Sequence, residues 1–343
     1  MNYKVQIDDV EPAQWAAYAS AFSDYTLYQT WAYQDVRADI DDQTVSRAIV
    51  KDEQDNVVAM AHVRIKHVES LKLRIGYIQT GPLFFRKDGA CACSVDVVKA
   101  LHEAYLGPIV NVLRIAPNII DAPENRGYVQ VFEANGFQRL ENPAPYHTMI
   151  LPLGCSTEDL RTGLHQKWRR KLRKAEKVGV EVVVRSDEEP FRILEDFYRE
   201  LRERKGFKGV DPEIFARSHR ALPGAEKMSL VVASFEGEPV TVHVASHLGD
   251  TAIALLVAGN ARGYSCNSSY LAWWKVLTTA NEKGMRQIDF GGIDFENNLN
   301  VSRFKAGMGG EEKSHIGVFE AYTNFVVKGI FRKADMIYTK LKR

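Results

Sequence analysis

The sequence has few cysteines and no long apolar run. Its four cysteines, Cys91, Cys93, Cys155 and Cys266, are too scattered for a disulfide scaffold in a chain of 343 residues. Cys91 and Cys93 have no second Cys/His pair to complete a metal site, so we expect no bound metal. There is no stretch of about 18 apolar residues and no apolar signal core at the start. These absences predict a soluble, cytoplasmic protein with reduced thiols.

The sequence also lacks an excess of charge of either sign. It contains 45 Lys and Arg against 44 Asp and Glu, a formal net charge of +1. Contact with a nucleic acid or another phosphate must therefore come from a local cluster of cations. The composition is otherwise ordinary, with 45% hydrophobic residues, and the length predicts two globular domains.

Strand and helix patterns occur in two similar series. The first half predicts a hairpin, a strand, a helix, a strand, a helix ended by a glycine, and a last strand, over residues 46–65, 73–84, 94–106, 109–117, 129–137 and 147–153. The second half predicts a three-strand meander, a helix, a strand, a short segment and a strand, over residues 228–259, 269–284, 286–292, 301–307 and 315–322. We infer two copies of one β-meander–α–β–α–β unit.

Short segments make the repeat more specific. They are "IDAPEN" followed by "FEANGF" in the first copy, and "IDFEN" followed by "FKAGMG" in the second. This alignment places Glu133 opposite Lys305. A residue that the fold requires should keep its character in both copies. The reversed charge therefore indicates that Lys305 serves a site found only in the second copy.

A strongly basic helix is expected between the copies, over about residues 156–179. Ser156 and Asp159 form an N-cap pattern, and Gly179 marks the end. One apolar stripe follows helical spacing, at Leu164, Trp168, Leu172 and Ala175.

Cations crowd the other faces of this helix, where Glu176 is the single acidic residue among seven basic ones. Like charges at this spacing destabilise a helix, and a polyanionic partner would relieve the repulsion. The alternative is a solvated surface. We expect contact with tRNA or another phosphate at Lys167, Arg169, Arg170, Arg173 and Lys174.

A second amphipathic helix is expected at about residues 324–343. Its apolar stripe comprises Val327, Ile330, Phe331, Ala334, Ile337, Tyr338 and Leu341. The pattern predicts a helix that packs back on the first domain, and a basic amphipathic helix is also typical of peripheral membrane contact.

Five motifs together resemble the FemABX family of peptidyltransferases: "YQTWAYQDV", "IQTGPLF", "LHQKWRRKLRKAEKVGVEV", "IDFGGI" and "RFKAGMGGE". That family consists of two tandem GNAT-like domains. The resemblance implies an α/β fold with mixed sheets, a first domain over residues 1–154, and a second over residues 155–343 that opens with the basic helix. The long coiled-coil arm of some members has no counterpart here, so the chain resembles an armless type.

The resemblance also implies a function. Family members transfer an amino acid from an aminoacyl-tRNA to an amine, usually of a peptidoglycan precursor, and aminoacyl-tRNA is a co-substrate rather than a bound cofactor. Without the arm, another small peptide or metabolite is an alternative acceptor. A CoA-dependent N-acyltransferase is the alternative enzyme, although "RKDGACACS" and "RGYSCNS" lack the spaced glycines that cradle the CoA pyrophosphate. A non-enzymatic RNA- or lipid-binding protein is a third interpretation, and the oligomeric state stays open.

The candidate site lies in the second copy. We expect Lys305 to stabilise the developing oxyanion or bind a phosphate, and Asp294 to act as general base. Asp289 is an alternative base, and either carboxylate could instead cap a turn. If the segment is extended, Arg303 and Lys305 share one side. Predicted substrate contacts are Arg303, Phe304, Gly291, Gly292, Tyr264 and Trp274.

His243 and His247 are four residues apart in a strand pattern. No third ligand accompanies them, so the sequence predicts no metal there.

Overall fold

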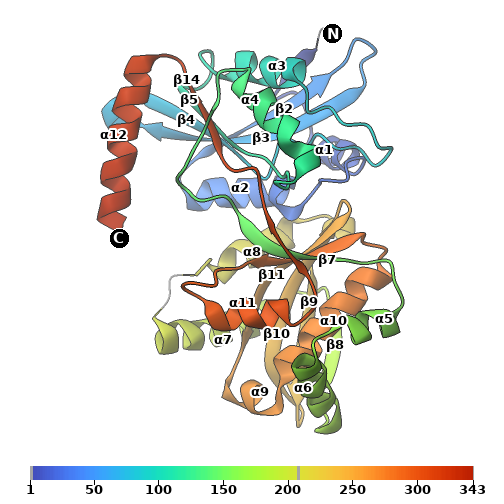
Figure 1. Ribbon diagram of the computed structural model, residues 1–343. Coiled ribbons are helices and arrows are strands. Elements are labelled where there is room, and N and C mark those ends of the chain that lie inside the picture. Colours follow the sequence, from blue (N-terminus) through green and yellow to red (C-terminus); the bar gives the residue numbers. More distant parts are fainter. Residues whose placement is uncertain (1–2, 207–208, 343) are drawn as a thin grey trace. The chain divides into compact units, whose positions relative to one another are not determined.

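The protein is described by a computed structural model covering residues 3–206 and 209–342, with segments 204–205 and 335–342 described by their backbone alone. The chain divides into two compact units (Figure 1). The first comprises Met1–Tyr146 and Ser314–Arg343, and the second comprises His147–Lys313. Each unit contains one seven-stranded mixed sheet, so the predicted tandem of mixed α/β domains is confirmed.

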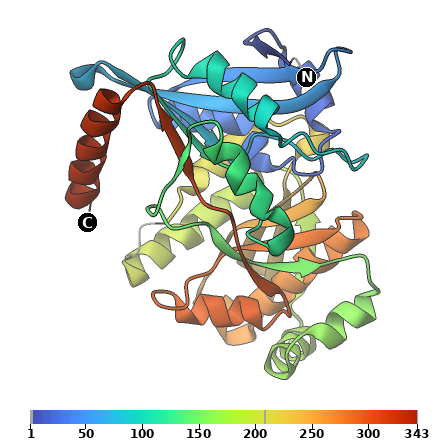
Figure 2. The same ribbon diagram turned by 45° about the horizontal axis from the view of Figure 1, so that its top comes forward.

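The first sheet has the strand order β1-β2-β3-β4-β5-β14-β6. The strands are Lys4–Ile7, Thr44–Lys51, Val57–Val68, Leu73–Gln79, Val112–Ala116, Phe319–Tyr322 and Gln138–Arg139 in that order. Neighbouring strands β4 and β5 are parallel. Figures 1 and 2 show helices on both faces, α3 and α4 on one and α2 with α1 on the other; their bounds are Val95–Tyr105, Arg126–Glu133, Trp31–Ile40 and Pro12–Ala19.

The second sheet has the order β13-β7-β12-β11-β10-β9-β8. These strands are Glu311–Ser314, His147–Pro152, Gln287–Gly292, Thr251–Gly259, Glu238–Leu248, Ser229–Phe235 and Glu181–Arg185. The predicted meander is β9, β10 and β11, which pair antiparallel in sequence order. Helix α10 packs on β9 and β10, and α7 packs on β10 and β11; they span Ser268–Glu282 and Glu189–Lys205, with α8 (Pro212–Ala221) against α7.

The strand orders of the two sheets are equivalent, except that each sheet takes one strand from the other half of the chain. Read from β8, the second sheet runs β8-β9-β10-β11-β12-β7-β13, which matches β1-β2-β3-β4-β5-β14-β6. The strand next to β5 comes from the second half of the chain, and the strand next to β12 comes from the first. The repeats therefore exchange one strand each.

This exchange moves the domain boundaries. The predicted boundary at 154/155 lies inside the second unit, because β7 pairs with β12 through Gln287↔Pro152, Ile288↔Leu151 and Asp289↔Ile150. Residues 314–343 return to the first unit, because β14 pairs with β5 and β6.

Helix α12 (Phe325–Lys342) packs against the first sheet, as the apolar stripe predicted. Phe331 is buried with Leu73 and Val112, and Val327 packs against them. The predicted stripe residues Ile337, Tyr338 and Leu341 have side chains outside the described part of the structure.

The basic segment forms two helices rather than one. Helix α5 (Thr157–Gly163) has Ser156 as its N-cap, accepting from the Asp159 amide at 3.1 Å. Leu164 and His165 are then extended, and α6 (Gln166–Lys177) follows. The break is fixed by a neighbouring segment, because the His165 amide donates to the Gly307 carbonyl at 2.9 Å.

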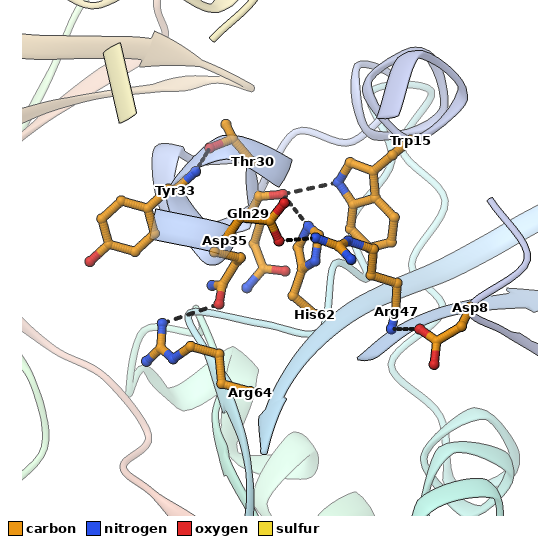
Figure 3. Close-up of polar contacts among 10 residues, drawn as sticks. Asp8, Trp15, Gln29, Thr30, Tyr33, Asp35, Arg47, His62 and Arg64 are labelled. Carbon is orange, nitrogen blue, oxygen red and sulfur yellow. Dashed lines mark hydrogen bonds and ion pairs between the residues drawn. The ribbon is translucent and has the colours of Figure 1, made fainter. Parts of the chain in front are cut away.

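Two of the family-like motifs, "YQTWAYQDV" and "IQTGPLF", meet in the first unit through Gln29. Figure 3 shows Gln29 with Trp15 and His62. The Gln29 carbonyl accepts from Trp15 Nε1 at 3.0 Å and lies 3.1 Å from His62 Nε2. The Gln29 side-chain amide donates to the Gln79 carbonyl at the end of β4. A Cβ at Gly81 would lie 2.7 Å from Gln29 Nε2, which explains why the segment after β4 carries a glycine there. These motifs hold the first core together.

Candidate functional site

A cavity opens where two parallel strands of the second sheet separate. Strands β11 and β12 are paired from Thr251↔Gln287 to Ile253↔Asp289, and beyond that point β11 stays with β10 while β12 follows β7. In the first unit the equivalent pair stays together through Gln79↔Ala116. The cavity has a volume of about 570 Å³ and is lined by apolar side chains together with His243, Asn297, Asn298 and Lys305.

Lys305 lies in the wall of this cavity. Its Nζ donates to the Gly292 carbonyl at 2.8 Å, at the end of β12. Partial burial lowers the pKa of Lys305 to about 8, and the nearby Asp289 carboxylate opposes this shift. The ammonium is thus held in place, mostly charged at neutral pH and close to its titration point.

Asp289 is the carboxylate beside Lys305. It is buried, and it accepts from the Gly291 amide at 2.7 Å and from the Thr148 hydroxyl. Burial raises the pKa of Asp289, although both hydrogen bonds favour the charged form. Gly291 has a φ of +79°, and a Cβ there would lie 3.2 Å from the Ala254 carbonyl oxygen and 3.4 Å from Lys305 Nζ. Gly291 and Gly292 therefore shape the strand end around Lys305.

Asp294, the predicted base, lies in a turn instead. Its carboxylate accepts from the amides of Glu296 and Asn297 at 3.0 and 2.8 Å, and from Asn297 Nδ2 at 2.9 Å. These bonds, those from Asn297 above all, lower the pKa of this exposed carboxyl group. The geometry matches the turn-capping alternative and favours Asp289 as the carboxylate that acts on Lys305.

The segment around Lys305 is helical, which corrects the extended alternative. Helix α11 spans Leu299–Ala306, so Arg303 and Lys305, two positions apart, point to different sides. Arg303 is exposed. Phe304 packs in an aromatic cluster, with its ring centroid 5.0 Å from that of Tyr270, 5.7 Å from that of Trp168 and 6.1 Å from that of Trp273.

Two of the predicted aromatic substrate contacts lie outside the cavity wall. Tyr264 lies on the six-residue helix α9 (Ala261–Cys266) and is 53% exposed, and neither it nor Trp274 belongs to the cavity wall. The preceding residue, Trp273, lines the cavity. A run of two tryptophans on a helix gives no sign of which one faces the sheet.

The basic helix α6 has the predicted two faces. Leu164 before it and Trp168, Leu172 and Ala175 within it are buried. Glu176 pairs with Arg161, at 2.7 Å, rather than with the cations of α6. Among the described residues no carboxylate forms an ion pair with the five predicted phosphate-binding side chains, Lys167, Arg169, Arg170, Arg173 and Lys174.

Two glycines that follow Lys305 make close contacts with the α5–α6 segment. A Cβ at Gly307 would lie 2.8 Å from Trp168 Cδ1, and one at Gly309 would lie 2.9 Å from the Gly163 carbonyl oxygen. Gly309 also has a φ of +88°. The glycines after Lys305 thus permit a close approach of two helices and do not form an anion-binding loop.

The structure gives little support to a CoA pyrophosphate cradle at "RGYSCNS". A Cβ at Gly263 would lie 2.4 Å from the Val240 carbonyl oxygen, and its amide donates to Asn260 Oδ1 at 3.0 Å. Among the side chains that the structure describes, no group of three His, Cys, Asp or Glu residues is placed to hold a metal ion. None of the described helices is long and apolar enough to cross a bilayer.

Comparisons with known proteins identify the fold of this chain. Residues 163–305, which contain the basic helix, the cavity and Lys305, match the family model described as an acetyltransferase (GNAT) domain. The structure of FemX superposes with a TM-score of 0.80 at 17% identity, over 92% of this chain and 97% of that one. The chain has the fold of FemX. The resemblance to the FemABX family is confirmed at the level of the fold.

Two more distant structures share this architecture. L-PGS from Bacillus licheniformis has a TM-score of 0.52 at 12% identity, covering 92% of both chains. The C-terminal domain of a putative lysylphosphatidylglycerol synthetase from Agrobacterium fabrum has a TM-score of 0.53 at 11% identity, covering 94% of this chain and 96% of that one. A comparison with curated protein sequences finds no match. The fold is therefore a tandem of two GNAT-like units.

Proposed function

We propose that this protein is an aminoacyltransferase that moves an amino acid from an aminoacyl-tRNA to an amine acceptor and forms an amide bond. The observation that carries the proposal is the Lys305 ammonium in a cavity at a strand split, on a helix packed against α6. The FemX fold supports a tRNA donor. So does the basic face of α6, whose five predicted phosphate-binding side chains form no ion pair with a carboxylate among the described residues. Such a donor needs no bound cofactor, because its ester is already activated.

The reaction requires few catalytic groups from the protein. The amine nitrogen attacks the ester carbonyl carbon, the new C–N bond forms, and the C–O bond to the tRNA ribose breaks. The proton lost by the nitrogen ends on the ribose oxygen. Lys305 would stabilise the negative charge that develops on the carbonyl oxygen. In other enzymes, removing one group with this role by mutation lowers the rate by about 100–1,000-fold. Asp289 would keep Lys305 protonated, and the absence of a side chain at Gly291 lets Lys305 Nζ lie close to the strand end.

The acceptor is the less defined partner. A nucleotide-sugar peptide of the peptidoglycan pathway is the first choice, because the fold is that of FemX, and another small peptide or metabolite is the second. Contact with a lipid surface through α12 is a further part of the proposal. Phe325, Val326 and Ile330 on that helix are 85%, 53% and 41% exposed.

A CoA-dependent N-acyltransferase is the second candidate. The match of residues 163–305 to an acetyltransferase (GNAT) model favours it. The occupied amide of Gly263 and the absence of spaced glycines at the helix start count against it.

The deciding experiment supplies both donors to the same protein. Labelled amino acids on a total charged tRNA pool, and labelled acetyl-CoA, are each offered with a set of amine acceptors. We expect transfer from tRNA, lost in Lys305→Met and weakened by the charge reversal Arg170→Glu/Lys174→Glu. The matched control is Lys87→Glu/Lys99→Glu, the same change of charge on exposed lysines of the first unit. Transfer from acetyl-CoA alone would replace the first candidate with the second.

A further inference from the structure

Strand β8 forms an open edge of the second sheet. It pairs antiparallel with β9 on one side and is the last strand in the sheet order. Among the described residues no strand pairs with its other side. Val183 and Val184, in the middle of the strand, are 53% and 39% exposed. The edge therefore presents backbone groups beside apolar side chains, and such an edge is a template for another strand.

The other edges of the two sheets carry features that discourage strand pairing. β6 has only two residues, and β13 carries Glu311, Glu312 and Lys313. β1 begins with Lys4, and helix α3 packs against it. Short length, charged side chains and a covering element are means by which native proteins block association at an edge. β8 has five residues, and its charges lie only at its two ends, on either side of three consecutive valines.

The sequence of β8, "EVVVR", is complementary to itself when two copies pair antiparallel. A two-fold axis at Val183 places this valine opposite its counterpart, and it places Glu181 opposite Arg185 of the second copy. Side chains alternate between the two faces of a strand, so these three share the face opposite to the one on which Val182 packs against the core. Directly opposed unlike charges stabilise a strand pair, and like charges destabilise it.

The guanidinium of Arg185 is already held at the end of the strand. Its Nε and Nη2 donate to Asp187, both at 2.8 Å, and Nη2 also donates to Glu189 at 2.6 Å. Nη1 makes no hydrogen bond with any described residue, so it is available to a carboxylate of another chain. Glu181 is exposed and makes no ion pair among the described residues.

Charges beyond the two ends of β8 favour the antiparallel direction. Helix α6 ends in Lys174 and Lys177 just before the strand, and Asp187, Glu188 and Glu189 follow it. Antiparallel pairing brings the basic segment of one copy toward the acidic segment of the other. Parallel pairing would bring like charges together, and such a juxtaposition suppresses association.

We propose that two copies of this chain associate through β8, which pairs antiparallel with β8 of the second copy about Val183 and joins the two second-unit sheets into one. The occupant is a second copy because both the strand and its flanking charges complement themselves. The inference does not depend on the proposed function. A single pair of short strands makes a small interface, so the dimer should be reversible and dependent on concentration.

Sedimentation velocity over a concentration series tests the dimer on the full chain. We expect wild type to shift from monomer to dimer as its concentration rises. Val183→Lys should raise the dissociation constant at least about tenfold, because two ammonium groups would meet at the two-fold axis. Val95→Lys on α3 is the matched control, since Val95 is 44% exposed, and it should leave the constant unchanged. A wild type that stays monomeric, or an equal loss in both variants, would overturn the proposal.

A charge swap between chains tests the register. Glu181→Arg alone sets arginines opposite each other, and Arg185→Glu alone sets glutamates opposite each other, so neither variant should associate where wild type does. An equimolar mixture of the two should dimerise, because every arginine then faces a glutamate. Wild-type association of either variant alone, or no association in a mixture whose two components keep a cooperative thermal transition, would refute pairing about Val183.

A peptide copying residues 180–186 provides a test that needs no stable variant. It should dissociate the wild-type dimer, whereas the same peptide with its three central valines replaced by serine should not. Binding of the peptide to a wild type that does not associate would assign the edge to a strand of another protein, and the second copy would be the wrong occupant.

Discussion

Burial and one neighbouring carboxylate set the pH range in which Lys305 can act as a cation. Its pKa of about 8 lies far below the 10.5 of a free lysine because of burial, and only Asp289 opposes the shift. A role as cation requires the protonated form, so activity should fall as pH rises through this value. An acceptor amine gains activity over the same range by losing its proton, and the observed optimum reflects both.

Replacing Asp289 by asparagine should move the alkaline limb of the pH profile to lower pH. The substitution removes the charge that raises the pKa of Lys305, so the ammonium loses its proton earlier. The measurement is kcat/KM for the acceptor as a function of pH. Lys305→Arg serves as the comparison, because a guanidinium stays protonated and should abolish the limb. A limb at the same pH in Asp289→Asn would show that another group titrates there.

At the scale of elements, the contact between α6 and α11 depends on the absence of a side chain. Gly307 has an ordinary helical φ of −65°, so its requirement for glycine comes from its neighbours: a Cβ there would lie 2.8 Å from Trp168 Cδ1 and 3.3 Å from the Phe304 carbonyl oxygen. The basic helix and the Lys305 helix are therefore coupled by packing, and a shift of one should be felt by the other.

We expect Gly307→Ala to destabilise the protein by about 1–3 kcal/mol, the usual cost of forcing an extra methyl group into a packed site. Gly127→Ala in helix α4 is the matched control, because a Cβ at Gly127 would have no atom within 4 Å and the change should stabilise by roughly 0.4–1 kcal/mol. Urea denaturation measures both. Equal stability of the two variants would mean that Trp168 moves aside freely.

Helix α12 supports a separate prediction about a lipid surface. Replacing Phe325, Val326 and Ile330 by serine should reduce sedimentation with phosphatidylserine vesicles several-fold, because these exposed apolar side chains would enter the interface. Ile40→Ser/Val95→Ser, on exposed apolar residues of α2 and α3, is the matched control. No binding of wild type to these vesicles would remove the lipid from the proposal.

Sequence patterns predicted elements well and contacts between elements poorly. The α6 stripe and the meander follow from local periodicity and turn residues, and both are present. The break at Leu164 was missed because its cause, the Gly307 carbonyl, lies more than a hundred residues away. The comparison of the two copies singled out Lys305 by its charge, but nothing in the sequence marked His243 as a residue of the cavity wall.

At the scale of the whole molecule, the exchanged strands predict how the chain can be cut. A fragment 1–154 should not fold cooperatively, because it lacks β14. Phe319 of that strand is 0% exposed and stacks on Phe132 with ring centroids 4.6 Å apart. Glu320 is also buried and pairs with Arg114 at 2.6 Å.

Joining residues 3–146 to 314–334 through a short glycine linker should restore a cooperative urea transition. The two ends are adjacent, since the His315 amide donates to the Tyr146 carbonyl at 2.9 Å. Circular dichroism during denaturation compares this chain with fragment 1–154. A cooperative transition in fragment 1–154 would contradict the importance assigned to β14.

The exchange has a consequence for the order of folding during synthesis. Domains usually fold as they leave the ribosome, the N-terminal one first. Here the second unit is continuous, from β7 to β13, whereas the first sheet stays open beside β5 until β14 has been made. The unit that is translated first is therefore completed last. Until then its sheet has an open edge to which a chaperone can bind.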